Sequence, residues 1–528
     1  MVTFSNTQWF SAVVTACAIS SVLCCNILIL PGPSAGNFYV TISRFGELFA
    51  MRGHNVTVLI NDLFYQRFAG LMKQQRTFMN FEEYECGFSD TPVEYDILTK
   101  STQIMPSILE ALRVFEVMAE ETNAFIEDGK LIERLNASNF DLIFANVFNP
   151  GYALIVDILR VPFISVSTAR PLPMIDDLIH GLTSNPAYIP AVTTGYSDKM
   201  TFPQRLNNVF AYLASAAILE FVVLKPFKIV QQRHNIRPEL SYRSLCGNAE
   251  LVLFCSDFAF DYPRPMMPHG IYIGSLTART PDPLSQEWTE FVESAEEGIV
   301  VFTLGSQVNI GEDMEKATKF VRAFARLPQK VIMKYVGNPP NGLGENTKLS
   351  SWIPQNDLLG HPNTKAFIGH GGINGINEAI YHAVPFIGVA TFGDQFENTR
   401  RLVDKGMAIV IDLKSFTEDD VYNAVKQVIE DPRYKENAAR LSSIQRDTPM
   451  PPGDAAVFWI EHILKFGGDH LKPASLQLNF LQYYLLDIAI FLLAVVAIVI
   501  IILQQVIRLI FKMCCKPTNI KLKRKKEQ

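Results

Sequence analysis

A strand, a loop with two glycines, a helix and a second strand follow one another over residues 364–391. The short apolar run 364–368 predicts a buried strand, and His370-Gly371-Gly372 comes two residues later. Apolar residues at helical spacing predict a helix over Ile373–Tyr381, and the run 386–391 predicts the next strand. Strands joined through a helix in this way lie parallel in one sheet. This segment therefore predicts an α/β fold.

The same rhythm recurs on both sides of that segment. Its alternation of short apolar runs with helical stretches predicts parallel sheets with helices on both faces. Prolines and polar residues interrupt the rhythm at 275–285, and 528 residues, 48% of them hydrophobic, are enough for two domains. The further predicted strands are 26–30, 56–60, 141–145, 162–166, 298–304, 330–335 and 408–411.

The loop before the predicted helix has the chemistry of an anion site. Free N–H groups and the dipole at a helix start attract a phosphate without a metal, and Gly371 and Gly372 let it approach the backbone closely. His370 and Asn374 add hydrogen-bond donors, and Glu378, on the same helix face as Asn374, offers a carboxylate to ribose hydroxyls. The alternative for His370 is a loop histidine bonded only to backbone.

Further polar and aromatic residues flank this loop. Asp394 and Gln395 follow the predicted strand 386–391, at the carboxyl end where open α/β sheets bind ligands, and they suit sugar hydroxyls. Upstream, Trp352 offers a flat face for a base, and Gln355 offers an amide for a base or ribose edge. The alternatives are a core aromatic for Trp352 and a turn former or helix cap for Asp394.

The spacing of these residues resembles a known signature. It is similar to that of the UDP-glycosyltransferases, specifically the membrane-bound UDP-glucuronosyltransferases of animals. The matching residues are Trp352, Pro354-Gln355, His370-Gly371-Gly372, Asn374-Gly375, Glu378-Ala379 and Asp394-Gln395.

The resemblance implies a GT-B architecture, in which two Rossmann-like α/β domains face each other, with one C-terminal transmembrane helix added here. It implies an enzyme that moves a sugar, glucuronic acid before glucose or N-acetylglucosamine, from a UDP-sugar to a lipophilic small molecule. The implied transfer is inverting and needs no metal or other cofactor, and homo- or hetero-oligomers with related transferases are implied partners. The implied donor-binding residues are Ser306, Trp352, Gln355, His370, Gly371, Gly372, Asn374, Glu378, Asp394 and Gln395.

The catalytic pair of the family is not matched. Counted back from Arg52-Gly53-His54, the family's catalytic histidine aligns with Phe38, and the aspartate that orients it aligns with Asn146. Phenylalanine cannot accept a proton. We weigh three alternatives: an amine or partly ionised phenol as acceptor, another base such as His180 or Asp157, or a catalytically impaired regulatory subunit that still binds UDP-sugar.

Both ends of the chain have features of a membrane protein. The apolar run within 1–25 predicts a signal peptide, with a buried helix or an uncleaved anchor as the alternative. Residues 488–507 carry no charge and are long enough to cross a bilayer. The basic tail predicts a cytosolic C-terminus, and its last residues, Lys525-Lys526-Glu527-Gln528, resemble a dilysine retrieval signal. We expect a single-pass type I protein of the endoplasmic reticulum membrane, in contact with lipid.

The predicted domain plan follows from these features. The net charge of −6, without a basic stripe in the globular part, makes nucleic acid an unexpected partner. The segments are a signal peptide at 1–25, an acceptor-binding domain at 26–275, a linker at 276–290, a UDP-sugar-binding domain at 291–470, a transmembrane helix at 485–507 and a tail at 508–528.

Three smaller features leave alternatives open. Cys246 and Cys255 can form a disulfide or remain buried thiols. Asn136 and Asn55 begin glycosylation sequons, and Asn55 is expected to be buried because it enters a strand. The apolar stretch 212–230 is best interpreted as a core helix, with a membrane-associated element or an acceptor-pocket lining as alternatives.

Overall fold

The structure is a computed structural model. It describes residues 24–30, 36–61, 79–84, 108–173, 175–192, 194–305, 308–391 and 393–514. The predicted signal peptide up to residue 23 and the tail beyond Cys514 lie outside the described residues. The chain divides into two compact units, Met1–Lys472 and Pro473–Gln528.

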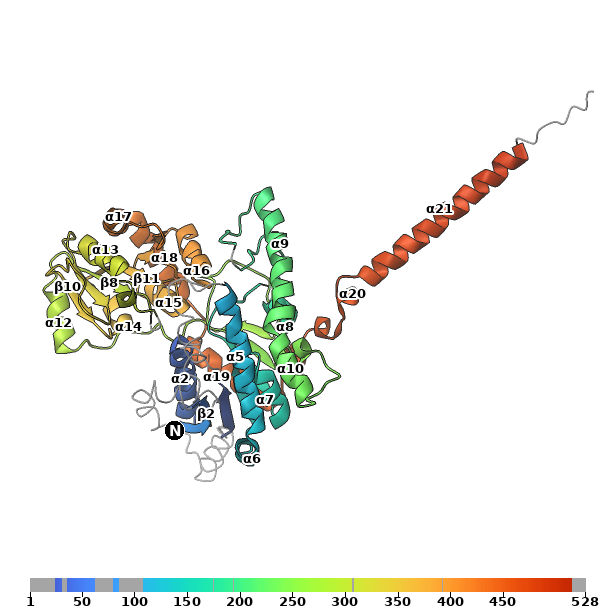
Figure 1. Cartoon of the computed structure of the whole chain (residues 1–528), viewed down its shortest axis with the longest axis horizontal. Helices are drawn as coiled ribbons and strands as arrows, with labels where there is room; N and C mark the ends of the chain where they lie inside the picture. The colour runs from blue at the N-terminus through green and yellow to red at the C-terminus, as the bar shows by residue number, and fades with distance from the viewer. Residues whose placement is uncertain are drawn as a thin grey trace, which may run out of the picture. The chain divides into compact units, whose positions relative to one another are not determined.

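Two parallel sheets form the framework of the first unit, as the sequence predicts (Figure 1). The first sheet contains β1 (Asn26–Leu30), β2 (Asn55–Asn61), β3 (Asn80–Tyr84), β4 (Leu142–Asn146), β5 (Phe163–Ser167), β6 (Leu251–Phe254) and β7 (Gly270–Tyr272). The second contains β8 (Ile299–Thr303), β9 (Lys330–Lys334), β10 (Thr347–Ser350), β11 (Thr364–Gly369), β12 (Phe386–Gly388) and β13 (Ala408–Val410). Of these strands, β3, β6, β7 and β10 are absent from the sequence prediction.

The two sheets share one winding pattern. Their strand orders are β3-β2-β1-β4-β5-β6-β7 and β10-β9-β8-β11-β12-β13, and every described pair is parallel. In both, the order reverses once, between β1 and β4 and between β8 and β11. This is the Rossmann-like, doubly wound topology, in which ligands bind beyond the carboxyl ends of the strands at the reversal.

Alternate residues of the strands supply both faces of each sheet. Ile143 and Ala145 of β4 belong to one apolar cluster, and Leu142 and Phe144 belong to the other. Helices of the first cluster are α5 (Ile108–Glu127), α6 (Gly129–Ala137), α7 (Tyr152–Leu159), α8 (Ile175–His180), α10 (Lys225–Arg233) and α11 (Tyr242–Cys246). The opposite face is covered by α2 (Gly36–Met51).

The second sheet is covered in the same manner. Val300 and Phe302 of β8 face α13 (Met314–Phe324) and α17 (Glu418–Glu430) in one cluster. The other face packs against α12 (Gln286–Glu293), α14 (Gln355–Leu359), α15 (Ile373–Tyr381), α16 (Gln395–Asp404) and α18 (Pro432–Arg446).

The last helix of this unit, α19 (Pro452–Phe466), packs on the first sheet. Its residues Ala456 and Ile460 lie in one cluster with Ile27 of β1. Figure 1 shows α19 beside α2, although about 400 residues separate the two helices in the sequence. Arg52, which follows α2, donates a hydrogen bond to Asp454 at 2.8 Å. The predicted second domain of 291–470 thus includes a helix whose apolar face belongs to the first sheet.

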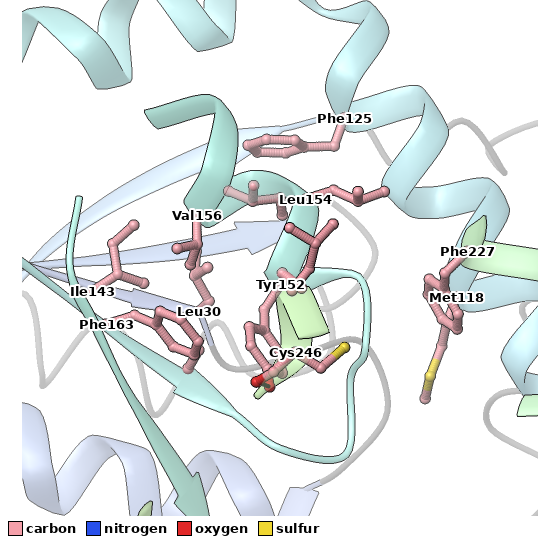
Figure 2. Packing of buried hydrophobic residues seen from close by; sticks show 14 of the residues in the cluster. Leu30, Met118, Phe125, Ile143, Tyr152, Leu154, Val156, Phe163, Phe227 and Cys246 are labelled. Atoms are coloured by element: carbon pink, nitrogen blue, oxygen red, sulfur yellow. Dashed lines mark hydrogen bonds between the residues drawn. The ribbon is translucent and has the colours of Figure 1, made fainter. Parts of the chain in front are cut away.

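The apolar stretch 212–230 is divided between two environments. Phe227 of α10 is fully buried in the cluster that contains Met118 and Phe125 of α5 (Figure 2). In contrast, Asn208 is the only buried residue of α9 (Phe202–Ile218), which runs into a π-helical segment, η1 (Leu219–Val223). The core-helix interpretation is therefore right for α10 and wrong for α9.

Cys246 and Cys255 are free thiols. They lie in the apolar clusters on opposite faces of the first sheet, so the disulfide alternative is wrong. Burial raises the pKa of both thiols above the usual value.

The second unit contains one long apolar helix, α21 (Leu486–Cys514). Its most apolar window has a mean hydropathy of 3.3, and none of that window is buried. By length and composition it can cross a membrane, and it includes nearly all of the predicted span at 485–507. Two short helices, η4 (Ala474–Gln477) and α20 (Phe480–Tyr483), precede it.

A buried ion pair joins the first sheet to the second. Arg170, which follows β5, donates to Glu397 of α16 at 2.5 Å, and each side chain is only 1% exposed. Nearby, Asp261 accepts hydrogen bonds from Tyr272 and Arg401 at 2.7 and 3.3 Å. Although burial opposes it, the guanidinium groups of Arg264 and Arg401 hold the pKa of Asp261 below its usual value.

We expect Glu397→Leu to lower the free energy of unfolding by about 3–5 kcal/mol, because it removes the carboxylate to which the buried Arg170 guanidinium donates. The double variant Arg170→Met, Glu397→Leu should lose less, since no unpaired guanidinium remains. Glu82→Leu removes a partner of the exposed Arg134 and should cost about 1 kcal/mol or less. Urea unfolding of the full chain in detergent measures all three, and equal losses in the single and double variants would contradict the assignment.

Candidate functional site

A cavity of about 600 Å³ lies where the carboxyl ends of the second sheet meet the first half of the chain. Thr303 ends β8, Lys334 ends β9, and both line it, together with the loop after β11 and the start of α15. The opposite wall includes Ser43, Arg44 and Glu47 of α2. This is the reversal point at which doubly wound sheets bind ligands.

His370 is held between two glycines. A Cβ atom on Gly305 would lie 2.6 Å from the His370 ring, and one on Gly372 would lie 2.4 Å from it. Gly305 also has a φ of +83°, which favours glycine. Burial, with a smaller effect of Lys334, lowers the pKa of His370 to about 4. The ring is therefore neutral at pH 7 and has one N–H to donate.

The start of α15 presents backbone donors to the same cavity. Gly372 occupies the position before the helix, and no side chain caps its first turn. Gly371, with a φ of +86°, packs against Thr399 and the Gln395 carbonyl, so a Cβ there would lie within 2.7 Å of Thr399. Uncapped N–H groups and the helix dipole at such a position can attract an anion.

Lys334 adds a positive charge that the sequence analysis did not identify. It lines the cavity, donates to the Gly305 carbonyl at 2.5 Å, and lies 5.9 Å from the centroid of the Trp352 ring. Burial lowers its pKa from the usual value. The signal was present, because 330–335 is a predicted strand and Lys334 stands at its carboxyl end.

The other end of the cavity suits a base and a ribose. Trp352 is 68% exposed, so it is not the core aromatic of the alternative reading. Gln355 donates to Glu378 at 2.5 Å. Burial raises the pKa of Glu378 to about 8, although the Gln355 hydrogen bond acts against it. Glu378 is buried at the cavity wall, where a carboxyl group can accept hydrogen bonds from a ligand with hydroxyl groups.

Asn374 connects the two halves of the chain. It lines the cavity, and its Nδ2 donates to Thr41 Oγ1 of α2 at 3.5 Å. With this residue, the structure brings most of the predicted donor set to one cavity. The members that line it are Trp352, Gln355, His370, Gly371, Gly372, Asn374 and Glu378.

Three predicted donor residues are not among the lining residues. Ser306 lies outside the described residues. The Gln395 amide oxygen accepts from the Thr391 N–H at 2.8 Å and from its hydroxyl at 2.7 Å. Asp394 stands before α16 and accepts from Asn398 at 2.7 Å, as expected for a helix-terminal residue. Their contact with a sugar stays a prediction.

The family's dyad positions lie in the first half. The side chain of Phe38, in α2, is outside the described part of the chain. Asn146 ends β4, is buried, and accepts a hydrogen bond from the Phe148 N–H at 2.9 Å. The two alternative bases do not line the cavity. His180 is buried and Asp157 pairs with Arg237 at 3.5 Å.

The two sequons differ in their surroundings. Asn136 is exposed near the end of α6. Asn55 is also exposed, so the expectation of burial is wrong. However, Asn55 Nδ2 donates to Asn26 Oδ1 at 3.1 Å, and Asn55 Oδ1 accepts from Asn80 Nδ2 at 2.8 Å. Nδ2 is the nitrogen that a glycan would modify.

Comparison with solved structures agrees with this fold. The chain is similar to CalG4, the calicheamicin glycosyltransferase, with a TM-score of 0.58, 17% identity, and coverage of 84% of this chain and 99% of that one. It is also similar to the spinosyn forosaminyltransferase SpnP, with a TM-score of 0.57, 16% identity, and coverage of 84% and 99%. At this identity the likeness shows the fold alone, which is the predicted GT-B architecture.

Comparison of sequences shows the family. Residues 26–521 match the family model "UDP-glucoronosyl and UDP-glucosyl transferase". UDP-glucuronosyltransferase 2B15 of Homo sapiens is 34% identical over 97% of this chain and 98% of its own length. UDP-glucuronosyltransferase 2C1 of Oryctolagus cuniculus is 40% identical over 76% of this chain and 80% of its own. The chain belongs to the UDP-glucuronosyl and UDP-glucosyl transferases, a family of enzymes.

Proposed function

We propose that this chain transfers a sugar, glucuronic acid in the first place, from a UDP-sugar to a lipophilic small-molecule acceptor. The observation that carries the proposal is the single cavity in which Trp352, Glu378, Lys334 and His370 lie beside the start of α15. A stacking face, a ribose-binding carboxylate and an anion site are the three parts that a uridine diphosphate requires. The family and its named relatives support the same donor.

In the proposed arrangement, the UDP-sugar lies along this cavity with its base at Trp352 and its diphosphate at the start of α15. The uracil ring stacks on Trp352, and the ribose hydroxyls meet Glu378 and Gln355. The diphosphate then reaches the N–H groups at Gly371 and Gly372, with His370, Asn374 and Lys334 around it. The sugar follows, toward Asp394 and Gln395. Because Lys334 and the helix dipole supply positive charge here, the proposed transfer needs no metal ion.

Departure of UDP is the step that these residues assist. Charge develops on the diphosphate as the bond to the sugar breaks, and preorganised donors stabilise that charge most in the transition state. Neutral His370 keeps its N–H for this purpose, because its pKa of about 4 lies well below neutral pH. Attack of the acceptor from the opposite side inverts the anomeric carbon, without a covalent enzyme intermediate.

Proton removal from the acceptor is the step in which this chain departs from its family. With Phe38 and Asn146 at the dyad positions, we propose an acceptor that needs little help from a base, such as an amine or a partly ionised phenol. The second candidate function is a regulatory subunit that binds UDP-sugar without turnover and pairs with active relatives. The same two residues are the observation that favours it.

The proposed setting is the endoplasmic reticulum membrane. A cleaved signal peptide, lumenal α/β domains, the span α21 and a cytosolic dilysine tail make a type I topology. Exposed Asn136 is the better of the two proposed glycosylation sites, because the Asn55 amide already bridges Asn26 and Asn80.

Acceptor-dependent release of UDP tests the activity. The full chain in membranes is offered UDP-glucuronic acid, UDP-glucose or UDP-N-acetylglucosamine, each with mixed phenol and amine acceptors. We expect release above the acceptor-free rate, largest with UDP-glucuronic acid. If no donor gives acceptor-dependent release of UDP while UDP itself still binds, the regulatory function would be assigned instead.

Lys334→Met should weaken UDP binding about tenfold or more and leave uridine binding unchanged. The reason is that a charge-assisted contact to the diphosphate is worth about 1.5–3 kcal/mol, and uridine has no phosphate. Lys330→Met, at the opposite end of the same strand β9, is the matched control and should change neither affinity. Calorimetric titration measures both ligands, and an equal loss for uridine would place Lys334 outside the diphosphate site.

The affinity for uridine should rise from about pH 6 to about pH 8. Free Glu378 has a pKa of about 8, so it is protonated below that pH and must release a proton to accept hydrogen bonds from two ribose hydroxyls. That cost falls as pH rises and vanishes above the pKa. Glu378→Gln should bind uridine weakly with no such slope. A pH-independent affinity in the unaltered chain would contradict the role of Glu378.

Phe38→His combined with Asn146→Asp should raise transfer to phenols, because it restores the family's base and its orienting carboxylate. Aspartate keeps an oxygen that accepts from the Phe148 N–H, so the end of β4 is preserved. Asn146→Asp alone is the control and should give no gain. Initial rates with a phenol acceptor measure the effect, and no gain in the double variant would refute the alignment of the dyad.

A further inference from the structure

Helix α9 exposes a large apolar surface. Among its side chains, Phe202 is 70% exposed, Phe210 62% and Leu213 59%, and Phe221 in the adjoining η1 is 70% exposed. Leu206 and Val209 are also exposed. The positions 202, 206, 209, 210 and 213 recur at helical spacing, so they form one stripe along α9. Below, "the α9 stripe" means these five residues and Phe221.

The inner face of the same helix is polar. Asn208 is fully buried, and its amide donates to the carbonyls of Pro186 and Ile189 at 2.7 and 2.9 Å. Its oxygen accepts from the Ala191 N–H at 2.7 Å. Tyr212 donates to Asp177 at 2.5 Å. Helices at a water-exposed surface have the opposite arrangement, with apolar residues inward and polar residues outward.

We propose that the α9 stripe is a second membrane contact of this protein, which lies in the interface of the bilayer that α21 spans. The polar anchors at Asn208 and Tyr212 fix the helix to the body of the chain and turn the stripe outward. Such an arrangement is stable when the outward side meets an apolar medium.

Two observations select the bilayer as the occupant. First, only residues 473–485 separate the first unit from α21, a tether that reaches at most roughly 45 Å, so this unit stays close to a membrane that α21 enters. Second, the charged residues from 202 to 229 are basic apart from Glu220: Arg205, Lys225 and Lys228 are exposed next to the stripe. Basic residues beside an apolar stripe are typical of helices at lipid headgroups.

The acceptor-pocket alternative for this stretch is not supported by the described cavity. None of the stripe residues lines it, and the cavity wall on this side of the chain is built from α2. The stripe is therefore a surface of its own within the described residues. The proposal rests on α21 as a membrane anchor and is independent of the sugar, the acceptor and the catalytic base.

Quenching by brominated lipids tests the proposal on the full chain in phosphatidylcholine vesicles. Leu213→Trp places a fluorophore in the stripe, and Met314→Trp, at a 43% exposed position on α13, is the matched control. The emission that each variant adds to that of the parent chain is compared in vesicles with and without bromine on the acyl chains. Each variant must bind UDP as the parent does, and Phe210→Trp replaces Leu213→Trp if that variant fails to fold.

We expect the emission added by Leu213→Trp to be largely quenched, most strongly by bromine near the headgroup end of the acyl chains, because interfacial helices lie about 5–10 Å deep. The emission added by Met314→Trp should be unaffected. Unquenched emission at position 213 would overturn the proposal. Unquenched emission that shifts to the red when the chain is diluted into excess lipid would overturn it in favour of a second copy of the chain on this face.

Discussion

Parallel pairing of β8 with both β9 and β11 is the constraint on which the candidate donor site depends. It brings the ends of three strands side by side, so that Thr303, Lys334 and the loop at His370 open into one cavity although they are distant in sequence. Close packing then fixes the ring: Gly305 after one strand and Gly372 after another leave only the space that the His370 imidazole fills. The pairing of the strands, rather than any single motif, thus places the neutral His370, Lys334 and the uncapped N–H groups of α15 at one cavity.

Local patterns predict one part of this structure and sheet pairing decides the rest. The strand at 26–30 and the helix Ile373–Tyr381 are predicted at the observed bounds, because apolar spacing alone specifies them. Strand β6 has only four residues, and three of the four residues of the edge strand β10 are polar, so each becomes a strand only through pairing with its neighbour. Lys334 ends a predicted strand, but a lysine at a strand end is usually solvated, so its place in the cavity wall follows only from the way the strands pair. Conversely, Gln395 matches the family signature, yet its amide oxygen is occupied by Thr391.

The two halves of the chain differ in how closely they follow their family. At the second sheet, Trp352, Glu378 and the start of α15 lie at one cavity, while the first half has Phe38 and Asn146 at the positions where the resemblance places a base and its partner. Seven of the ten predicted donor residues line that cavity, and the role of the other three stays a prediction. The buried Arg170–Glu397 pair still fastens the halves to each other, and Asn374 still reaches α2.

The position of α19 has a consequence for how the protein is made. Helix α19 covers the face of the first sheet that contains Ile27 and Ile29. The core of the first half of the chain, which leaves the ribosome first, is therefore completed only when residues 452–466 have been synthesised. The second sheet, synthesised in between, can fold while Ile27, Ile29 and Val58 still lack part of their cover. A messenger that stops shortly before residue 452 would encode every described residue that lines the cavity. Its product would still have an open apolar face, which quality control of nascent chains is expected to recognise.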